Sequence, residues 1–235
     1  MAKKVLPVKK RPAKKKFVAI AIAATAIASA AGWWTISTGK FKTQVPTDIA
    51  THIIDGDTFL TKSDILIRMA DMNAPETGRC GSKEATEELT KLISGKPLYL
   101  RIDMLDSYKR FIALVYTPEG LVNEAMLRSG WVRIEKRTGP EKEKLGIASQ
   151  YAIDHKLGIY SEKCLSTKPD KPGCDIIGNV RHGNSDKIYT LPGCQSYPTT
   201  VLQKDQGDQW FCTEAEAIKA GFVRSGNCHS NIGKE

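Results

Sequence analysis

The segment from Ile53 to Thr77, IIDGDTFLTKSDILIRMADMNAPET, combines residue types that could act on a charged substrate. Asp57, Asn73 and Glu76 carry oxygen atoms of the kind that coordinate a hard metal ion. Arg68 adds a fixed cation within a mostly apolar run. Oxygen ligands beside such a cation suit an anionic substrate that gains negative charge during its reaction. The competing interpretation is structural, namely two turns and one salt bridge.

Two further blocks, DSYKR and LVNEAMLRSG, follow DGDT, Arg68 and NAPET along the chain. These five blocks, in this order, resemble the staphylococcal nuclease (thermonuclease) family. The resemblance extends from about Thr47 to Ser161. It implies an OB-type barrel with three helices, and calcium-dependent hydrolysis of phosphodiester bonds in DNA and RNA.

The resemblance implies a Ca²⁺ site formed by Asp57, Asn73 and the backbone carbonyl of Ala74. Asp57 matches the first carboxylate ligand of the family. The second ligand is usually Asp in the family, whereas Asn73 keeps an oxygen donor but removes one negative charge. Because calcium affinity depends on the charge of the ligands, we expect a weaker site here.

The resemblance also assigns the catalytic roles to Arg68, Glu76 and Arg110. Glu76 matches the carboxylate that positions the attacking water. The two arginines match groups that clamp the phosphate, because a guanidinium can donate two parallel hydrogen bonds to its oxygens. Tyr108 matches a tyrosine that lies along the bound nucleotide, where stacking tolerates any base. A purely structural tyrosine would fit that position equally well.

The pattern around these residues predicts short strands and three helices. Apolar spacing predicts a helix over 81–96, capped by Ser82 and ended by Gly95. Alternation over 97–105 predicts a strand with one apolar face from Leu98 to Met104, joined by a short turn to a central strand, RFIALVY. Helices are also expected at LVNEAMLRSG and over 139–158, from Pro140 to Gly158. The order fits a β-barrel of OB type with three helices, an α+β domain.

The N-terminal region has the pattern of an export signal. The first sixteen residues hold eight basic residues and no acid, and an uncharged run follows over 17–36. This order predicts either cleavage near Ala28-Ser29-Ala30 or an uncleaved membrane anchor, with the rest of the chain outside the cytoplasm. Without these eight, the 35 basic residues of the chain fall to 27, against 26 acidic ones, so the net charge of +9 does not itself indicate a nucleic-acid partner.

Six cysteines without a CxxC pair indicate disulfides in an exported protein rather than a zinc site. Cys80 directly follows the NAPET block and Cys164 the last predicted helix, so these two are expected to pair. The segment from Cys174 onward resembles a small cysteine-containing module of some bacterial secreted nucleases, and weakly the zinc-binding end of a DNA alkylation-repair protein. Its expected disulfides are Cys174–Cys212 and Cys194–Cys228, and the alternative is a zinc site that includes His182 and His229.

The sequence therefore predicts an OB-type barrel followed by a small disulfide-rich α+β module. Thr213 and Glu216 have the spacing of a capping box for the one clear helix of that module, in a segment that otherwise shows little periodic structure. The expected organisation is an export segment over 1–38, a linker over 39–46, the barrel domain over 47–164, a second linker over 165–173 and the module over 174–235.

The predicted function is that of an exported calcium-dependent nuclease. One alternative is a binding protein of the same fold, whose catalysis is weakened by Asn73 and whose partner is a nucleic acid or another molecule. The retained Arg68, Glu76 and Arg110 argue against it. A second alternative is a surface interaction protein in which the C-terminal module is the active part.

Overall fold

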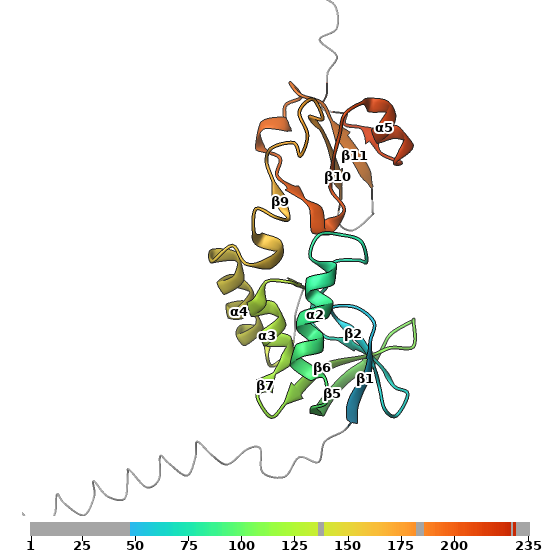
Figure 1. Ribbon diagram of the computed structural model, residues 1–235, viewed down its shortest axis with the longest axis vertical. Helices are drawn as coiled ribbons and strands as arrows, with labels where there is room; N and C mark the ends of the chain where they lie inside the picture. Colours follow the sequence, from blue (N-terminus) through green and yellow to red (C-terminus); the bar gives the residue numbers. More distant parts are fainter. Residues whose placement is uncertain (1–47, 136–138, 182–185, 227, 229–235) are drawn as a thin grey trace, which may run out of the picture. The chain divides into compact units, whose positions relative to one another are not determined.

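A computed structural model describes residues 48–135, 139–181, 186–226 and 228 of the 235-residue chain (Figure 1). The predicted export segment over 1–38 and linker over 39–46 lie outside this part, and so do His182 and His229. None of the helices in the described ranges has the length and apolar character needed to cross a membrane.

Five strands form a closed barrel. The strand order is β3-β2-β1-β5-β6-β7, and β3 also pairs in parallel with β6, which closes the ring. This arrangement is the OB-type barrel expected from the sequence. The bounds are β1 Asp48–Ile53, β2 Thr58–Thr61, β3 Leu66–Met69, β5 Pro97–Leu105, β6 Phe111–Thr117 and, added at the edge, β7 Gly120–Leu121.

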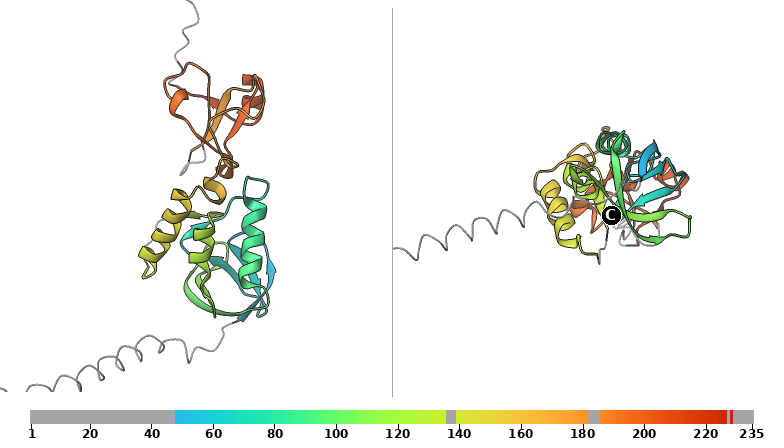
Figure 2. Two further views of the ribbon diagram at one scale, coloured as in Figure 1. Left: turned by 60° about the vertical axis from the view of Figure 1, so that its left-hand side comes forward. Right: turned by 90° about the horizontal axis from the view of Figure 1, so that it is seen from below.

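Three helices accompany the barrel: α2 (Ser82–Ile93), α3 (Val122–Ser129) and α4 (Lys142–Asp154). Figure 1 and the left view of Figure 2 show α3 between α2 and α4. Helix α3 packs against each of them. The core joins strands to helices, because Phe59, Leu89, Met126 and Leu145 are all fully buried in one cluster. Burying a side chain of this size stabilises the fold by about 1.5–3 kcal/mol.

Two helix ends differ from the sequence prediction. Ser82 does not cap α2; it is the first helical residue, and Gly81 is the N-cap in a left-handed conformation (φ 85°). A side chain at Gly81 would also meet Ile159, whose Cγ2 lies 2.8 Å from the ideal Cβ position. Helix α4 ends at Asp154, before Gly158, because Lys156 turns left-handed (φ 51°) and the next N–H returns to an earlier carbonyl.

The predicted apolar face of β5 is buried only in its first half. Leu98 is fully buried, but Ile102 is 43% and Met104 is 61% exposed. Strand β5 pairs with β1 only at its first two residues, and its pairing with β6 is irregular between Ile102 and Met104. The second half therefore continues into a hairpin whose apolar side chains face solvent.

The C-terminal part contains a small sheet, whose individual strands the sequence did not locate although it predicted an α+β segment here. Its order is β13-β10-β11-β14, with a buried cluster formed by Ile176, Tyr189, Phe211, Ala217 and Phe222. These strands are too short for alternation to reveal them. Their bounds are β10 Ile176–Val180, β11 Lys187–Thr190, β13 Gln209–Phe211 and β14 Val223–Arg224; helix α5 spans Glu214–Lys219.

Helix α5 begins as predicted, since the Thr213 side chain accepts a hydrogen bond from the Glu216 N–H (3.2 Å). The Glu216 carboxylate, however, accepts from the Cys212 N–H rather than from Thr213. Short paired segments complete the described structure: β4 Met72–Asn73 with β8 Arg133–Ile134, and β9 Leu165–Ser166 with β12 Leu202–Gln203. The 3₁₀ turns are η1 Gly158–Tyr160, η2 Tyr197–Thr199 and η3 Lys204–Gln206.

All six cysteines form disulfides, and no thiol remains free. Zinc ligation by the cysteines is therefore wrong as an interpretation of this segment, because the metal binds thiolates. One bridge ties the loop before α2 to the end of the barrel domain, and the other two lie within the C-terminal part. The pairs are those expected from the sequence: Cys80–Cys164, Cys174–Cys212 and Cys194–Cys228.

Candidate functional site

The DGDT block forms the tight connection between β1 and β2. The N–H of Asp57 donates to the carboxylate of Asp55 (2.9 Å), which closes the turn. A Cβ on Gly56 would come within 2.4 Å of the Ala85 Cβ of α2, so only glycine lets the helix pack this closely. The block is thus clamped between the barrel and α2, with Asp57 only 3% exposed.

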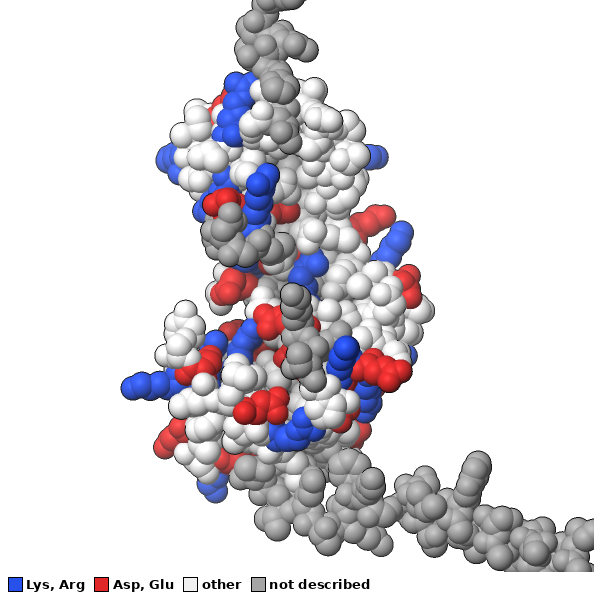
Figure 3. Space-filling view, turned by 180° about the vertical axis from the view of Figure 1, so that it is seen from behind, with Lys and Arg blue, Asp and Glu red and all other residues white. Residues whose placement is uncertain are grey.

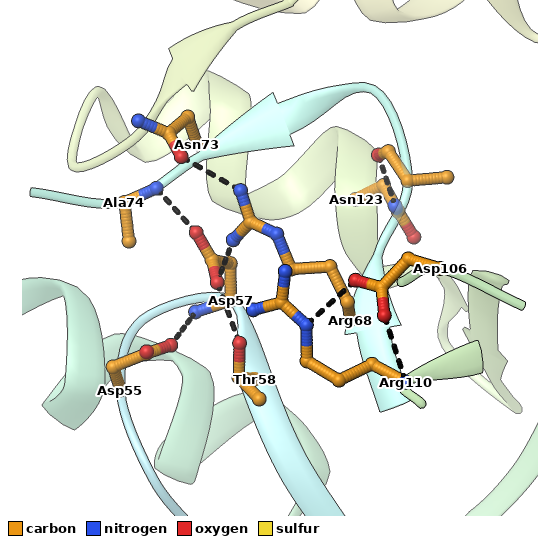
Figure 4. Close-up of polar contacts among 10 residues, drawn as sticks. Asp55, Asp57, Thr58, Arg68, Asn73, Ala74, Asp106, Arg110 and Asn123 are labelled. Atoms are coloured by element: carbon orange, nitrogen blue, oxygen red, sulfur yellow. Dashed lines mark hydrogen bonds and ion pairs between the residues drawn. The ribbon is translucent and has the colours of Figure 1, made fainter. Parts of the chain in front are cut away.

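The buried Asp57 carboxylate has three partners (Figure 4). It accepts hydrogen bonds from the Thr58 hydroxyl (2.8 Å) and the Ala74 N–H (2.5 Å), and it forms an ion pair with Arg68. A buried charge requires such partners to offset its loss of hydration. Ala74 is therefore joined to Asp57 through its N–H, while a ligand role for its carbonyl stays a prediction.

Arg68 connects the two side chains predicted to hold calcium. One terminal nitrogen of its guanidinium pairs with Asp57, and the other donates to the Asn73 side-chain oxygen (2.7 Å). Strand pairing sets this geometry, because Arg68 on β3 lies opposite Thr58 on β2. The oxygens of Asp57 and Asn73 therefore converge on a single positive group, as Figure 4 shows.

Several charges surround the Arg68 guanidinium. Burial lowers its pKa most strongly, and the neighbouring cation Arg110 lowers it too, whereas the carboxylates of Glu135, Asp55 and Glu76 raise it. Burial raises the pKa of Asp55, and the positive charges of Arg68 and Arg110 oppose that rise. Glu76 itself is exposed, in the loop before α2, and the N–H of Arg79 donates to its carbonyl (2.9 Å).

Glu135 was not singled out by the sequence, although it is the carboxylate that raises the Arg68 pKa most. Its position follows from the pairing of β4 with β8, since the Glu135 N–H donates to the Asp71 carbonyl (3.0 Å). The DGDT and NAPET blocks contain no signal for Glu135, because the pairing of β4 with β8 joins segments that lie far apart in the chain.

Arg110 is the second cation of the site. Its Nε donates to Asp106 (2.8 Å), and the terminal nitrogens of its guanidinium point toward Arg68 and Asp57 in Figure 4. Tyr108 is 77% exposed, and its ring centroid lies 5.3 Å from the Arg110 Cζ. The structure thus gathers Asp57, Asn73, Arg68 and Arg110, with Tyr108 at the rim.

Asn123 stabilises the strand ends beneath the site. It is fully buried, accepts a hydrogen bond from the Val115 N–H (2.9 Å) and donates to the Ala70 carbonyl (2.8 Å). Ala70 lies between Arg68 and Asn73 in the chain, so this amide holds the segment that carries both. The LVNEAM block therefore contributes to the site through structure rather than through contact.

The side chains that converge here could hold a hard cation, at a site whose ligands carry little negative charge. Two oxygens, one from a carboxylate and one from an amide, meet at one positive group, and such oxygens are the donors that calcium prefers. The described ranges contain no group of three or more His, Cys, Asp or Glu side chains that could hold a metal ion. Asp57 would therefore supply most of the negative charge of such a site.

One face of the described residues carries charges of both signs. Figure 3 shows basic and acidic side chains interspersed across it. That face therefore presents no broad positive field that would by itself attract an anion.

Comparisons with known proteins show which sequences this chain resembles. The profile of the staphylococcal nuclease homologue family matches residues 66–162. An uncharacterized endonuclease of Escherichia coli O157:H7 is 29% identical over 117 residues, which cover 47% of this chain and 74% of that protein. A probable endonuclease of Pyrenophora tritici-repentis is 35% identical over 45% of each chain. A micrococcal nuclease of Shigella flexneri is 29% identical over 43% of this chain and 53% of its own length. Residues 66–162, within the barrel domain, are thus similar to the staphylococcal nuclease family.

Proposed function

We propose that this protein is an exported, calcium-dependent nuclease that hydrolyses phosphodiester bonds in DNA and RNA. The observation that carries the proposal is the convergence of Arg68 and Arg110 beside the buried Asp57 (Figure 4). Two cations held close together repel each other, and an anion bound by both relieves that repulsion. A phosphodiester group has the required charge, and the nuclease names of the similar proteins support this choice.

Each side chain has a defined part in the proposed reaction. Arg68 and Arg110 bind the phosphate and stabilise the second negative charge that develops on it. Glu76 accepts a hydrogen bond from the attacking water and orients it toward phosphorus. Tyr108 provides an aromatic surface for a neighbouring base. Asp57, Asn73 and the Ala74 carbonyl would hold Ca²⁺, which when bound supplies Lewis-acid polarisation of a phosphate oxygen.

The contacts of Arg68 also suggest how substrate binding is regulated. Its guanidinium neutralises Asp57 and binds Asn73, so both of its terminal nitrogens already have partners. A buried carboxylate needs a positive partner, but that partner can be either a guanidinium or a divalent cation. If a cation neutralised Asp57 instead, the terminal nitrogens of Arg68 would be free to donate to a phosphate.

Export is supported by two independent features. Eight basic residues precede an uncharged run over 17–36, and the chain contains three disulfides, which persist in oxidising compartments. The protein would be membrane-bound if the run is retained and secreted if it is cleaved. We also propose that the residues after Cys174 form a separate module, because they have their own apolar cluster and two internal disulfides.

The test is to incubate the purified full-length chain with plasmid DNA, single-stranded DNA or RNA, in millimolar calcium or in excess chelator. Cleavage in calcium that disappears in chelator is the expected result, and Glu76→Gln should reduce kcat by about 10²-fold. Full activity in chelator would refute the metal requirement. Binding of the same nucleic acids without cleavage at any calcium concentration would favour the alternative of a binding protein.

A further inference from the structure

Asp106 organises the hairpin turn that carries the second arginine of the site. One carboxylate oxygen accepts hydrogen bonds from the N–H groups of Tyr108 (2.8 Å) and Arg110 (2.9 Å). The other accepts from the Arg110 side-chain Nε (2.8 Å). The Asp106 N–H also donates to the Arg110 carbonyl (2.9 Å), so one residue binds both ends of the turn.

The Nε contact determines which atoms of Arg110 remain available for the site. A guanidinium anchored through Nε keeps its two terminal nitrogens for a planar partner such as phosphate. In Figure 4 these nitrogens face Arg68 and Asp57. Arg110 and Arg68 repel each other, and the negative charge of Asp106 holds Arg110 in place against that repulsion.

We propose that Asp106 is a positioning residue, which sets the orientation of Arg110 and acts on the reaction only through it. The inference rests on the proposed nuclease function. It adds the carboxylate that orients the phosphate-binding guanidinium of Arg110. Neither DGDT nor NAPET includes Asp106, which is the first residue of the DSYKR block and lies in the turn between β5 and β6.

A turn alone does not account for this geometry. An Asp or Asn at the start of a turn needs one oxygen to accept the backbone N–H groups that follow. The second oxygen of Asp106 goes further, because it binds the arginine side chain. Asn at position 106 would keep the backbone bonds through its carbonyl oxygen, while its NH₂ group cannot accept from Nε. Asp106→Asn therefore separates the turn from the positioning role.

The chain offers a matched control on strand β5, which leads into the turn. Asp103 is exposed and lies 3.9 Å from Arg101, so Asp103→Asn removes the same charge from the hairpin without touching Arg110. Steady-state kinetics on a short single-stranded DNA in saturating calcium would compare both variants in the full-length chain. We expect Asp106→Asn to lower kcat about tenfold or more, with KM changed less and the thermal midpoint retained. Asp103→Asn should stay within about twofold of the wild type, as expected for an exposed pair.

A double-mutant cycle with Arg110→Ala tests whether Asp106 acts through the arginine. In that background, Asp106→Asn should cause no further loss of activity. An equal loss in both backgrounds would overturn the proposal, and so would wild-type kcat in Asp106→Asn. If Asp106→Asn lowers the thermal midpoint, the same kinetics are measured on Asp106→Ser, because serine can also accept the backbone hydrogen bonds of a turn. The same fall in kcat is expected. An inactive wild-type chain would refute the nuclease function, whereas an active wild type with an active Asp106→Asn refutes only the positioning role.

Discussion

Buried carboxylates occur both in the barrel and in the C-terminal part, but their surroundings differ. Asp205 is fully buried, and Arg133 binds it through two hydrogen bonds of 2.6 and 3.0 Å. Asp208 is 7% exposed and accepts from two backbone N–H groups and from Asn179. Each oxygen of these two carboxylates therefore has partners that also hold the fold together.

In the barrel, Asp57 is equally buried but shares its cation. Arg68 divides its two terminal nitrogens between Asp57 and Asn73, and a second cation, Arg110, lies beside it. Arg110 is in turn paired with Asp106, and the carboxylates of Glu135, Asp55 and Glu76 also act on Arg68. Burial of a charge is therefore not what distinguishes a candidate site from a structural contact. The distinguishing feature is that several charged groups interact around the buried carboxylate, whereas the structural carboxylates have one fixed set of partners.

The largest expected effect tests the structural side of this comparison. Arg133→Ala should reduce the free energy of unfolding by about 3–5 kcal/mol, because it leaves Asp205 buried without its positive partner. Chemical denaturation followed by circular dichroism measures this change. The control is Lys144→Ala, which breaks the exposed Lys144–Glu124 pair (2.7 Å) and should cost no more than about 1 kcal/mol. Equal effects of the two substitutions would contradict the comparison.

On the candidate-site side, Arg110→Lys and Arg68→Lys should impair activity more than folding. Lysine keeps the charge but lacks the planar fork, so one of two parallel hydrogen bonds to phosphate is lost. We expect kcat to fall about tenfold or more in each variant, with a smaller change in KM. The measurement is steady-state cleavage of a short single-stranded DNA. If both lysine variants keep wild-type kcat, the two arginines have no part in the chemistry.

A smaller effect is expected when the charge of the predicted metal site is increased. Asn73→Asp adds a negative charge beside Asp57 and should lower the calcium concentration that gives half-maximal activity. Asn73→Ala removes the oxygen and should raise that concentration. Calcium titrations of cleavage for the three proteins decide the question. A half-maximal concentration that is unchanged or higher in Asn73→Asp would show that this side chain is not a ligand.

The smallest effect concerns Asp55 and depends on pH. Burial raises the pKa of Asp55 above its value in the unfolded chain, so the folded state holds the proton more tightly. The stability from this group is present below the unfolded pKa and is lost as the pH rises through the folded pKa. Asp55→Asn keeps an oxygen that can accept the hydrogen bond from the Asp57 N–H. It cannot ionise, so it removes the loss of stability at higher pH. The thermal midpoint of the variant, relative to wild type, should rise as the pH increases above about 4, the ordinary pKa of an aspartate. A difference that does not change with pH would contradict the raised pKa.

Local sequence patterns predicted the parts of the fold in which neighbouring residues decide the structure. Gly130 ends α3 as expected, and Thr213 caps α5, because both depend on contacts within a few residues. For β5, alternation correctly predicted a strand with one apolar face up to Met104, but that face is covered only in its first half. Alternation shows which side chains share a face, but only the neighbouring elements determine whether that face is covered.

The sequence by itself determined the resemblance to a nuclease family, the order of the blocks and the residue types from which the proposed phosphate and calcium site is built. Tertiary structure alone decided how the charges are shared. Arg68 contacts Asp57 and Asn73 at once because β2 and β3 pair beside β4, and Glu135 enters through the distant strand β8. The contact between Asp106 and the Arg110 side chain, by contrast, is local, since the two residues are four positions apart in one turn. Electrostatic interactions depend on separation in space, which the order of residues does not specify.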